Sequence, residues 1–310
     1  MNSTFGFALL AAIFFGLSAI PAKRGLSHTD TQTGALISML TVVAVFLISS
    51  PWWMQSQDWF TAGFWIFVAT GLFHPALSFY FTLESMDRAG ATVASTLAAT
   101  SPIFAALTAM ILLGESMTLL IAIGTLVTMC GVMSLTWIPG TGITRIMRIA
   151  LVFATAAAVI RGLTNTTGKF GLDLMPNAMM AGFLSHTVGG LGVLVIYRLR
   201  RGRLPLNMSG AGFRAFGLSG CFIAIAIACM YSALLRNSVT LVSPVIGTYP
   251  VFTLLAALVQ ALLGRGQVHQ AGCLLAGVLL DQVEGPAVHR REVAVVLAAS
   301  MGGPRAAGPG

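Results

Sequence analysis

The stretch Gly16-Leu17-Ser18-Ala19-Ile20-Pro21-Ala22-Lys23-Arg24-Gly25-Leu26 occurs twice in this chain. Its second copy, at an offset of 146, is Gly162-Leu163-Thr164-Asn165-Thr166-Thr167-Gly168-Lys169-Phe170-Gly171-Leu172, with Gly, Leu, Lys, Gly and Leu in identical places. A second block, residues 88–109, aligns without a gap with residues 236–257 at an offset of 148, and eight of its 22 positions are identical. Two separate blocks at nearly one offset indicate an internal duplication.

Composition assigns this duplicated chain to a membrane. Of 310 residues, 17 are Lys or Arg and 9 are Asp or Glu, so 8% are charged and 56% are hydrophobic, and the mean hydropathy is +0.88. A soluble domain is about a quarter charged, which excludes a water-soluble enzyme and a nucleic-acid-binding protein. The sequence has no P-loop, HExxH, GxSxG or metal-ligand spacing, so we expect no catalytic residues, cofactor or metal. The four cysteines lie in apolar runs and are expected to be buried thiols: Cys130, Cys221, Cys229 and Cys273.

Nine apolar runs are long enough to cross the bilayer, which takes about 20 residues. They are residues 4–22, 33–50, 62–83, 90–113, 117–138, 148–168, 177–197, 211–235 and 238–263. The first run has no basic residue before it and Lys23 and Arg24 after it, so we predict a spanning helix rather than a cleaved signal peptide. Residues 268–281 are short and polar for a tenth helix; both a tenth helix and a tail that never inserts stay open. From residue 284 onward we predict disorder.

The duplication pairs the first helix with the sixth and the fourth with the ninth. A unit of five helices is odd, so the second copy enters the membrane upside down relative to the first. We therefore predict an all-α integral membrane protein of about ten transmembrane helices in a 5+5 inverted repeat. The repeats are predicted at residues 1–140 and 147–283, followed by a tail at 284–310. Inverted repeats are typical of secondary transporters, whose substrate site lies near the midplane where the repeats meet.

On these residues the chain resembles the drug/metabolite transporter (DMT) superfamily, EamA type. The likeness is carried by Gly16-Leu17-Ser18 with Lys23, by Ser101-Pro102-Ile103-Phe104 with Leu113-Gly114-Glu115, and by Tyr249-Pro250-Val251-Phe252. It covers about residues 4–263. It implies a ten-helix bundle that exports or exchanges small metabolites, often amino acids, across a bacterial inner membrane through a central cavity lined by helices 1, 3, 4, 6, 8 and 9. The sequence departs from the pattern after the ninth helix, where Gly264-Arg265 replaces a Gly-Glu pair.

Basic residues predict an orientation. With the N-terminus outside, eleven lysines and arginines lie in inside loops, against Lys169 and Arg236 outside. The inside set is Lys23, Arg24, Arg88, Arg145, Arg148, Arg198, Arg200, Arg201, Arg203, Arg214 and Arg265. The positive-inside rule favours this orientation, whereas the resemblance implies an N-terminus inside.

Arg161 is the leading candidate for binding substrate, because ionisable groups inside a membrane are costly and usually functional. Asn165 and Lys169 follow it at i+4 and i+8 on the same helical face. A guanidinium binds carboxylate or phosphate with two hydrogen bonds. The alternative is an arginine that snorkels or bonds to another helix.

The third helix supplies further candidates. His74 precedes Pro75 and is predicted to bind substrate or carry a coupled proton, or else to be a packed histidine. Glu84 is a second coupling candidate, with a helix-end ion pair to Arg88 at i+4 as the favoured alternative. Aromatic walls for a hydrophobic substrate are predicted from Trp65, Phe73, Tyr80, Tyr231 and Tyr249, with ordinary packing of each ring as the alternative.

Prolines mark repeat-related positions in the fourth and ninth helices. Pro102 and Pro250 are equivalent, and Pro244 precedes the latter. Proline interrupts backbone hydrogen bonding, so these three residues are predicted helix breaks that act as hinges or lie beside the site, or else static kinks.

These features together favour a secondary transporter that works by alternating access. Its partners would be a small-molecule substrate and the lipid bilayer, with proton coupling as one driving force, and the protein would be a monomer or a homodimer. The alternatives are a non-transporting or degenerate protein of the same fold, and a nucleotide-sugar or drug transporter of the same superfamily. A membrane enzyme is disfavoured, because the nine acids are scattered.

Overall fold

The computed structural model describes residues 2–82, 84, 85, 88, 97, 100–136, 145–202 and 210–263. These residues contain helices and no strand. The predicted tenth helix, the tail and most of residues 90–99 lie outside them. The helices are α1 (Asn2–Leu26), α2 (Thr31–Ser49), α3 (Ala62–Gly71), α5 (Ser101–Leu113), α6 (Leu119–Thr136), α7 (Arg145–Leu174), α8 (Ala178–Arg201), α9 (Ala211–Arg236), α10 (Val239–Ile246) and α11 (Tyr249–Leu263). Short helical turns η1 (Ser50–Trp52) and η2 (Ser56–Asp58) follow α2, and the π-helical turn η3 (Leu72–Leu77) follows α3.

Seven helical segments of the described part are long and apolar enough to cross a membrane. They are Phe5–Leu26, Thr31–Trp52, Ala62–Thr82, Arg148–Leu174, Ala178–Arg201, Ala211–Arg236 and Val239–Val259. The shorter apolar helix α5 and the 18-residue helix α6 fall within the predicted fourth and fifth spans. The predicted fold class, an all-α protein that crosses the membrane many times, is confirmed.

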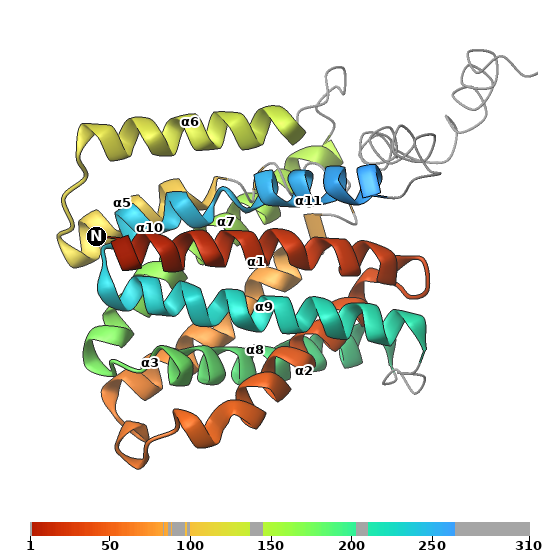
Figure 1. The fold of residues 1–310 in the computed structure, drawn as a ribbon, viewed down its shortest axis with the longest axis horizontal. Coiled ribbons are helices and arrows are strands. Elements are labelled where there is room, and N and C mark those ends of the chain that lie inside the picture. The colour runs from red at the N-terminus through yellow and green to blue at the C-terminus, as the bar shows by residue number, and fades with distance from the viewer. Residues whose placement is uncertain are drawn as a thin grey trace, which may run out of the picture.

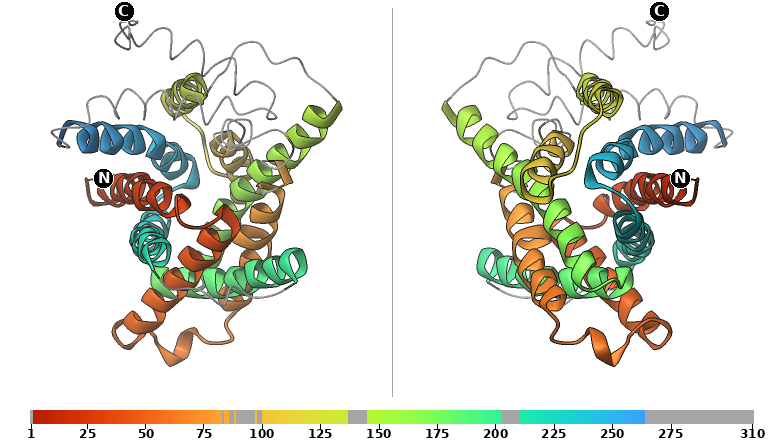
Figure 2. Two further views of the ribbon diagram at one scale, coloured as in Figure 1. Left: turned by 90° about the vertical axis from the view of Figure 1, so that its right-hand side faces the viewer. Right: turned by 90° about the vertical axis from the view of Figure 1, so that its left-hand side faces the viewer.

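Helix directions follow the inverted arrangement. In Figure 1, α1 runs from the N-terminal end to the opposite end of the bundle, whereas α7 runs from its residue-145 end back toward the N-terminal end. These two helices contain the two copies of the opening stretch, and they point in opposite directions. Figure 2 shows the bundle end-on, with α11 beside α1.

Glycine contacts repeat at the same offset as the sequence. A Cβ atom at Gly16 of α1 would stand 2.6 Å from the Phe252 Cβ atom of α11. A Cβ atom at Gly162 of α7 would stand 2.6 Å from the Phe104 Cβ atom of α5. Phe104 and Phe252 are themselves aligned at offset 148. Glycine permits this close approach of membrane helices, and the same contact is built twice.

A second pair of close contacts also occurs in both repeats: the third spanning segment contacts α8, and α9 contacts α2. A Cβ atom at Gly71 would lie 2.5 Å from the Ser185 carbonyl oxygen on α8, and one at Gly220 of α9 would lie 2.6 Å from the Ser38 carbonyl oxygen on α2. Gly71 and Gly220 differ by 149 residues, and Ser38 and Ser185 by 147. This recurrence extends the duplication to two pairs of helices that the sequence comparison did not align.

The caps of α2 and α8 correspond too. The Asp30 carboxylate accepts hydrogen bonds from the backbone N–H groups of Gln32 and Thr33. The Asn177 side-chain oxygen, 147 residues later, accepts one from the Met180 N–H group. Acidic and amide side chains satisfy the free N–H donors of a first helical turn, so both helices have a side-chain N-cap at corresponding positions.

The core lies where α2, α3, α7, α8 and α9 meet. Phe67, Leu172, Met180 and Leu234 are buried there. Many apolar side chains on the outer faces are exposed, such as Ile111 of α5 and Leu191 of α8. In a bilayer those faces contact lipid chains, so their exposure is the normal state of a membrane bundle.

Candidate functional site

Arg161 lies near the middle of α7, at least 13 residues from either end, which is about 20 Å along the axis. Its Nη2 atom donates a hydrogen bond of 3.0 Å to the Thr82 Oγ1 atom of the third spanning segment. Its Nε atom is buried and has no hydrogen-bond partner, and no carboxylate lies within ion-pair distance of the guanidinium among the described residues. A cation with spare donors therefore stands in the interior of the bundle.

Two predicted residues lie within the electrostatic reach of Arg161: His74 and Tyr249. His74 stands at an interruption of the third spanning segment, where its backbone is extended (φ −140°, ψ 123°) rather than helical. Its Nδ1 atom is 2.5 Å from the Ser78 Oγ atom. His186 of α8 also acts on His74 electrostatically, and its own Nδ1 atom is 3.0 Å from the Gly182 carbonyl oxygen. The predicted cation and the predicted histidine therefore belong to one locality.

A stripe of hydroxyl groups connects His74 to Arg161, and sequence reasoning missed it. Ser78, Thr82 and Ser85 follow His74 at helical spacing, and Thr82 donates a hydrogen bond of 2.7 Å to the Ser78 carbonyl oxygen. The buried Ser85 Oγ atom has no hydrogen-bond partner in the described ranges. The sequence feature that could have revealed this stripe is the spacing of its residues, which follow one another at intervals of four, four and three. Such intervals place side chains on one face of a helix.

Asn165 lies one turn beyond Arg161, and its Nδ2 atom donates a hydrogen bond of 3.4 Å to the Ser243 Oγ atom of α10. Lys169 is held apart from this locality by an ion pair of 3.2 Å with Asp173. The predicted polar face of α7 therefore divides into an inner part, Arg161 and Asn165, and an ion pair nearer the helix end.

The predicted aromatic residues are dispersed. Tyr249 is partly exposed and its ring lies 6.4 Å from that of Phe15. Tyr231 is buried in the core, with its hydroxyl 3.2 Å from the Ser185 Oγ atom. Trp65 is 57% exposed, in a cluster with Phe60 and Phe64. Among these residues, Tyr249 interacts electrostatically with Arg161.

Glu84 forms the ion pair with Arg88, as the favoured alternative predicted, with Oε2 2.6 Å from Nη2. Its other oxygen binds the Arg200 guanidinium of α8, a partner that sequence reasoning did not identify. The Arg200 guanidinium also lies 5.3 Å from the centre of the Tyr80 ring. Glu84 and Tyr80 therefore belong to a charged cluster that ties the third spanning segment to the C-terminal end of α8.

The prolines coincide with helix boundaries. α10 ends at Ile246 and α11 begins at Tyr249, so the predicted ninth span is broken between Pro244 and Pro250. Pro102 occupies the second position of α5. A Cβ atom at Gly247 would lie 3.2 Å from the Pro102 Cγ atom, which brings the two repeat-related breaks together. Whether they act as hinges stays a prediction.

Glu115 has a structural role that the sequence motif did not reveal. Its two carboxylate oxygens accept hydrogen bonds of 2.8 and 2.9 Å from the N–H groups of Val239 and Thr240, at the start of α10. A carboxylate at a helix N-terminus satisfies free donors and complements the helix dipole. Glu115 thus links the end of α5 to the start of α10.

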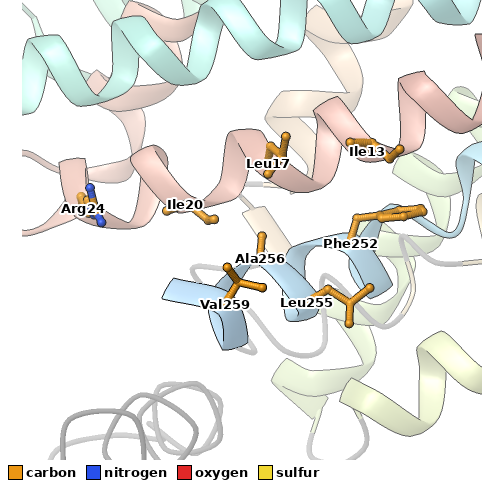
Figure 3. Close-up of a pocket in the computed structure, with 8 residues that line it drawn as sticks. All are labelled: Ile13, Leu17, Ile20, Arg24, Phe252, Leu255, Ala256 and Val259. Atoms are coloured by element: carbon orange, nitrogen blue, oxygen red, sulfur yellow. The ribbon is translucent and has the colours of Figure 1, made fainter. Parts of the chain in front are cut away.

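A hollow of about 540 Å³ lies between α1 and α11, and Figure 3 shows its lining. The lining residues are Ile13, Leu17, Ile20, Arg24, Phe252, Leu255, Ala256 and Val259. It is open and almost wholly apolar, and none of the predicted site residues lines it. Lipid chains fill such a surface in a bilayer, so we do not assign it to a polar substrate.

Comparison with known proteins agrees with this architecture. Residues 3–137 match the model of the EamA-like transporter family. A solved structure, described only as a crystal structure of a protein, superposes with a TM-score of 0.71 over 97% of this chain and 99% of its own length, at 17% identity. That likeness shows the fold alone. No curated protein matches the chain. Over residues 3–137, the chain is therefore similar to the EamA-like transporter family of the DMT superfamily.

Proposed function

We propose that this protein is a secondary transporter that exports small metabolites bearing a carboxylate or phosphate group, amino acids among them, across a bacterial cytoplasmic membrane by alternating access. The family that residues 3–137 match consists of transporters. The observation that supports a carboxylate or phosphate substrate is the Arg161 guanidinium, which lies in mid-helix with its Nε atom buried and unpartnered among the described residues. An uncompensated cation is costly inside a membrane, and a substrate anion would supply the missing partner.

The helix breaks support the alternating-access part. Asn165, one turn from Arg161, binds Ser243 beside Pro244, and the break in the ninth span follows within one turn. Movement of α11 about Gly247 and Thr248 would then displace the groups that surround Arg161. Inverted-repeat transporters place their substrates beside such discontinuous helices. Proton coupling would use His74, which bonds Ser78 and lies within electrostatic reach of Arg161.

Counterflow in proteoliposomes tests the proposal. Vesicles containing the purified protein and loaded with one unlabelled metabolite should accumulate the labelled form, and Arg161→Ala should abolish this accumulation. Arg148→Ala is the matched control, because Arg148 is an exposed arginine of the same helix, and it should retain flux. Absence of flux with every amino acid, carboxylate and phosphate ester would leave a non-transporting relative of the family as the better account.

A further inference from the structure

We infer that, within the proposed substrate class, the site at Arg161 prefers organic anions that carry no amino group over amino-acid zwitterions. This inference rests on the proposed function and narrows its substrate class.

The cationic side of the site is Arg161. Its guanidinium uses one Nη2 hydrogen for Thr82, and its buried Nε–H group has no acceptor within the part of the chain that the structure describes. Asn165, one turn further along the same face of α7, adds a neutral amide donor. A carboxylate or phosphate bound here would receive the charge-assisted hydrogen bonds that a guanidinium offers, and it would neutralise the cation.

The site has no carboxylate that could pair with a substrate ammonium group, because each acidic residue in the described part of the chain already has another partner. Glu84 binds Arg88 and Arg200, Glu115 caps α10, and Asp173 pairs with Lys169. Asp58 accepts a hydrogen bond from Asn177, and Asp30 caps α2 and pairs with Arg201. An α-ammonium group bound beside Arg161 would therefore find hydroxyl and carbonyl oxygens but no carboxylate.

The other titratable group at the site does not change this balance. His74, on the third spanning segment, interacts electrostatically with Arg161 and with His186 of α8. A histidine is neutral or positive and never negative. Protonation of His74 would thus add to the positive charge and strengthen the preference for an anion.

Charge balance decides between the two substrate classes. A monoanion brings the locality of Arg161 to zero net charge. A zwitterion leaves it at +1 and places an ammonium group in a low-dielectric interior without an ion-pair partner. Burying an unpaired charge is strongly unfavourable, so the amino group is a penalty rather than a recognition element here.

Matched solutes separate these classes. Lactate and alanine differ only by a hydroxyl group in place of the ammonium group, and so do phenyllactate and phenylalanine; phenethylamine lacks the carboxylate. Counterflow in proteoliposomes should be faster for each hydroxy acid than for its amino acid by about tenfold or more, and phenethylamine should not move. Arg161→Gln should remove flux of the hydroxy acids, whereas Arg161→Lys should retain the preference at a higher KM, because it keeps the charge and loses the planar donors.

Each outcome is informative. Faster or equal flux of alanine and phenylalanine would overturn the anion selectivity and leave the proposed transporter intact. Flux of no solute in the set, nor of any other metabolite, would overturn the proposed function itself. If Arg161→Gln does not elute as a folded protein, the wild-type preference within each matched pair still decides the question.

Discussion

Gly16 packs against Phe252 so closely that a Cβ atom at position 16 would stand 2.6 Å from the Phe252 Cβ atom. The same atom would lie 2.8 Å from the Tyr249 carbonyl oxygen and 2.9 Å from the Thr253 nitrogen. Because two of these three neighbours are backbone atoms, the contact cannot be relieved by rotating a side chain. The Gly162 contact with Phe104 and Ala105 has the same character.

Gly16→Ala and Gly162→Ala should therefore each lower the free energy of unfolding, by about 1–3 kcal/mol, through overpacking. Gly124→Ala is the control, because nothing lies within 4 Å of the added Cβ atom; it should be neutral or raise stability by up to about 1 kcal/mol. Thermal unfolding in detergent measures all three. Equal melting temperatures for Gly16→Ala and Gly124→Ala would show that the two helices are not in close contact.

Glu115 should be a structural requirement for the start of α10. Glu115→Ala leaves the N–H groups of Val239 and Thr240 without their acceptor, and we expect a loss of about 2–3 kcal/mol, since hydrogen bonds to charged groups are strong. Glu115→Gln keeps one acceptor oxygen and should lose about half as much. Thermal unfolding of both variants tests the order wild type, Gln, Ala. If the Ala variant unfolds like the wild type, solvent satisfies these donors and the link is dispensable.

Glu84 should stabilise the protein without carrying the coupled proton. Its carboxylate is bound by both Arg88 and Arg200, and its side chain is 15% exposed. Glu84→Gln is expected to cost about 1–2 kcal/mol, between the values for surface and buried ion pairs. Asp173→Asn removes a pair whose acid is 52% exposed and should cost about 0.5 kcal/mol or less.

Transport measurements distinguish the two interpretations of Glu84. If its only role is the ion-pair cluster, flux in the Glu84→Gln variant still responds to an imposed pH gradient. Flux that proceeds but no longer responds to the gradient would assign the coupling role to Glu84 instead of His74.

The extent of what sequence could predict depends on whether a pattern stays within one helix. The sequence predicts Arg161 and Asn165 on one face because a helix repeats every 3.6 residues, and each of them donates a hydrogen bond to a residue outside α7. The Thr82 and Arg200 contacts join residues 79 and 116 positions apart, so they depend on packing that no local period encodes. Pro75 also obscures the stripe that begins at His74, because it interrupts the helix between His74 and Ser78.

The duplication was likewise visible only in part. The Gly16 and Pro102 regions align without gaps. The Gly71–Ser185 contact and its counterpart Gly220–Ser38 use offsets of 149 and 147, and the shared features are small residues at packed positions. A close approach of two helices needs a small residue rather than one particular side chain. It is therefore hard to detect by aligning the sequences of the two repeats, but it is evident in the contacts between the helices.

Asp30 predicts a small dependence of stability on pH. Burial alone would raise its pKa, but the hydrogen bonds from Thr33, the charge of Arg201 and the hydrogen bond from Gln32 together lower the pKa below 3.8. A lowered pKa means that the ionised group stabilises the fold above about pH 4, and that this contribution is lost as the pH falls through the lowered pKa. The side chain is 43% exposed, so we expect at most about 0.5 kcal/mol.

Asp30→Asn isolates this contribution, because asparagine is an equally good helix cap. The difference in unfolding free energy between wild type and variant should be present at pH 6 and shrink toward pH 2. A difference that grows as the pH falls would have the wrong sign for this carboxylate.

The loops on either side of α2 should face opposite sides of the membrane, with the α1–α2 loop inside the cell. Figure 1 places this loop and the α2–α3 connection at opposite ends of the bundle. The first contains Lys23 and Arg24 at the end of α1, and the described basic residues of the α8 end share its side of the fold through the Arg201–Asp30 ion pair. The second connection, from Ser50 to Thr61, has no Lys or Arg.

In a protein without its four cysteines, Ser56→Cys should react with a membrane-impermeant maleimide in intact cells, and Ser27→Cys only after lysis. Both serines are exposed, so accessibility reports the side of the membrane. Labelling of Ser27→Cys alone in intact cells would place the N-terminus inside and show that the arginines of α8 do not set the orientation.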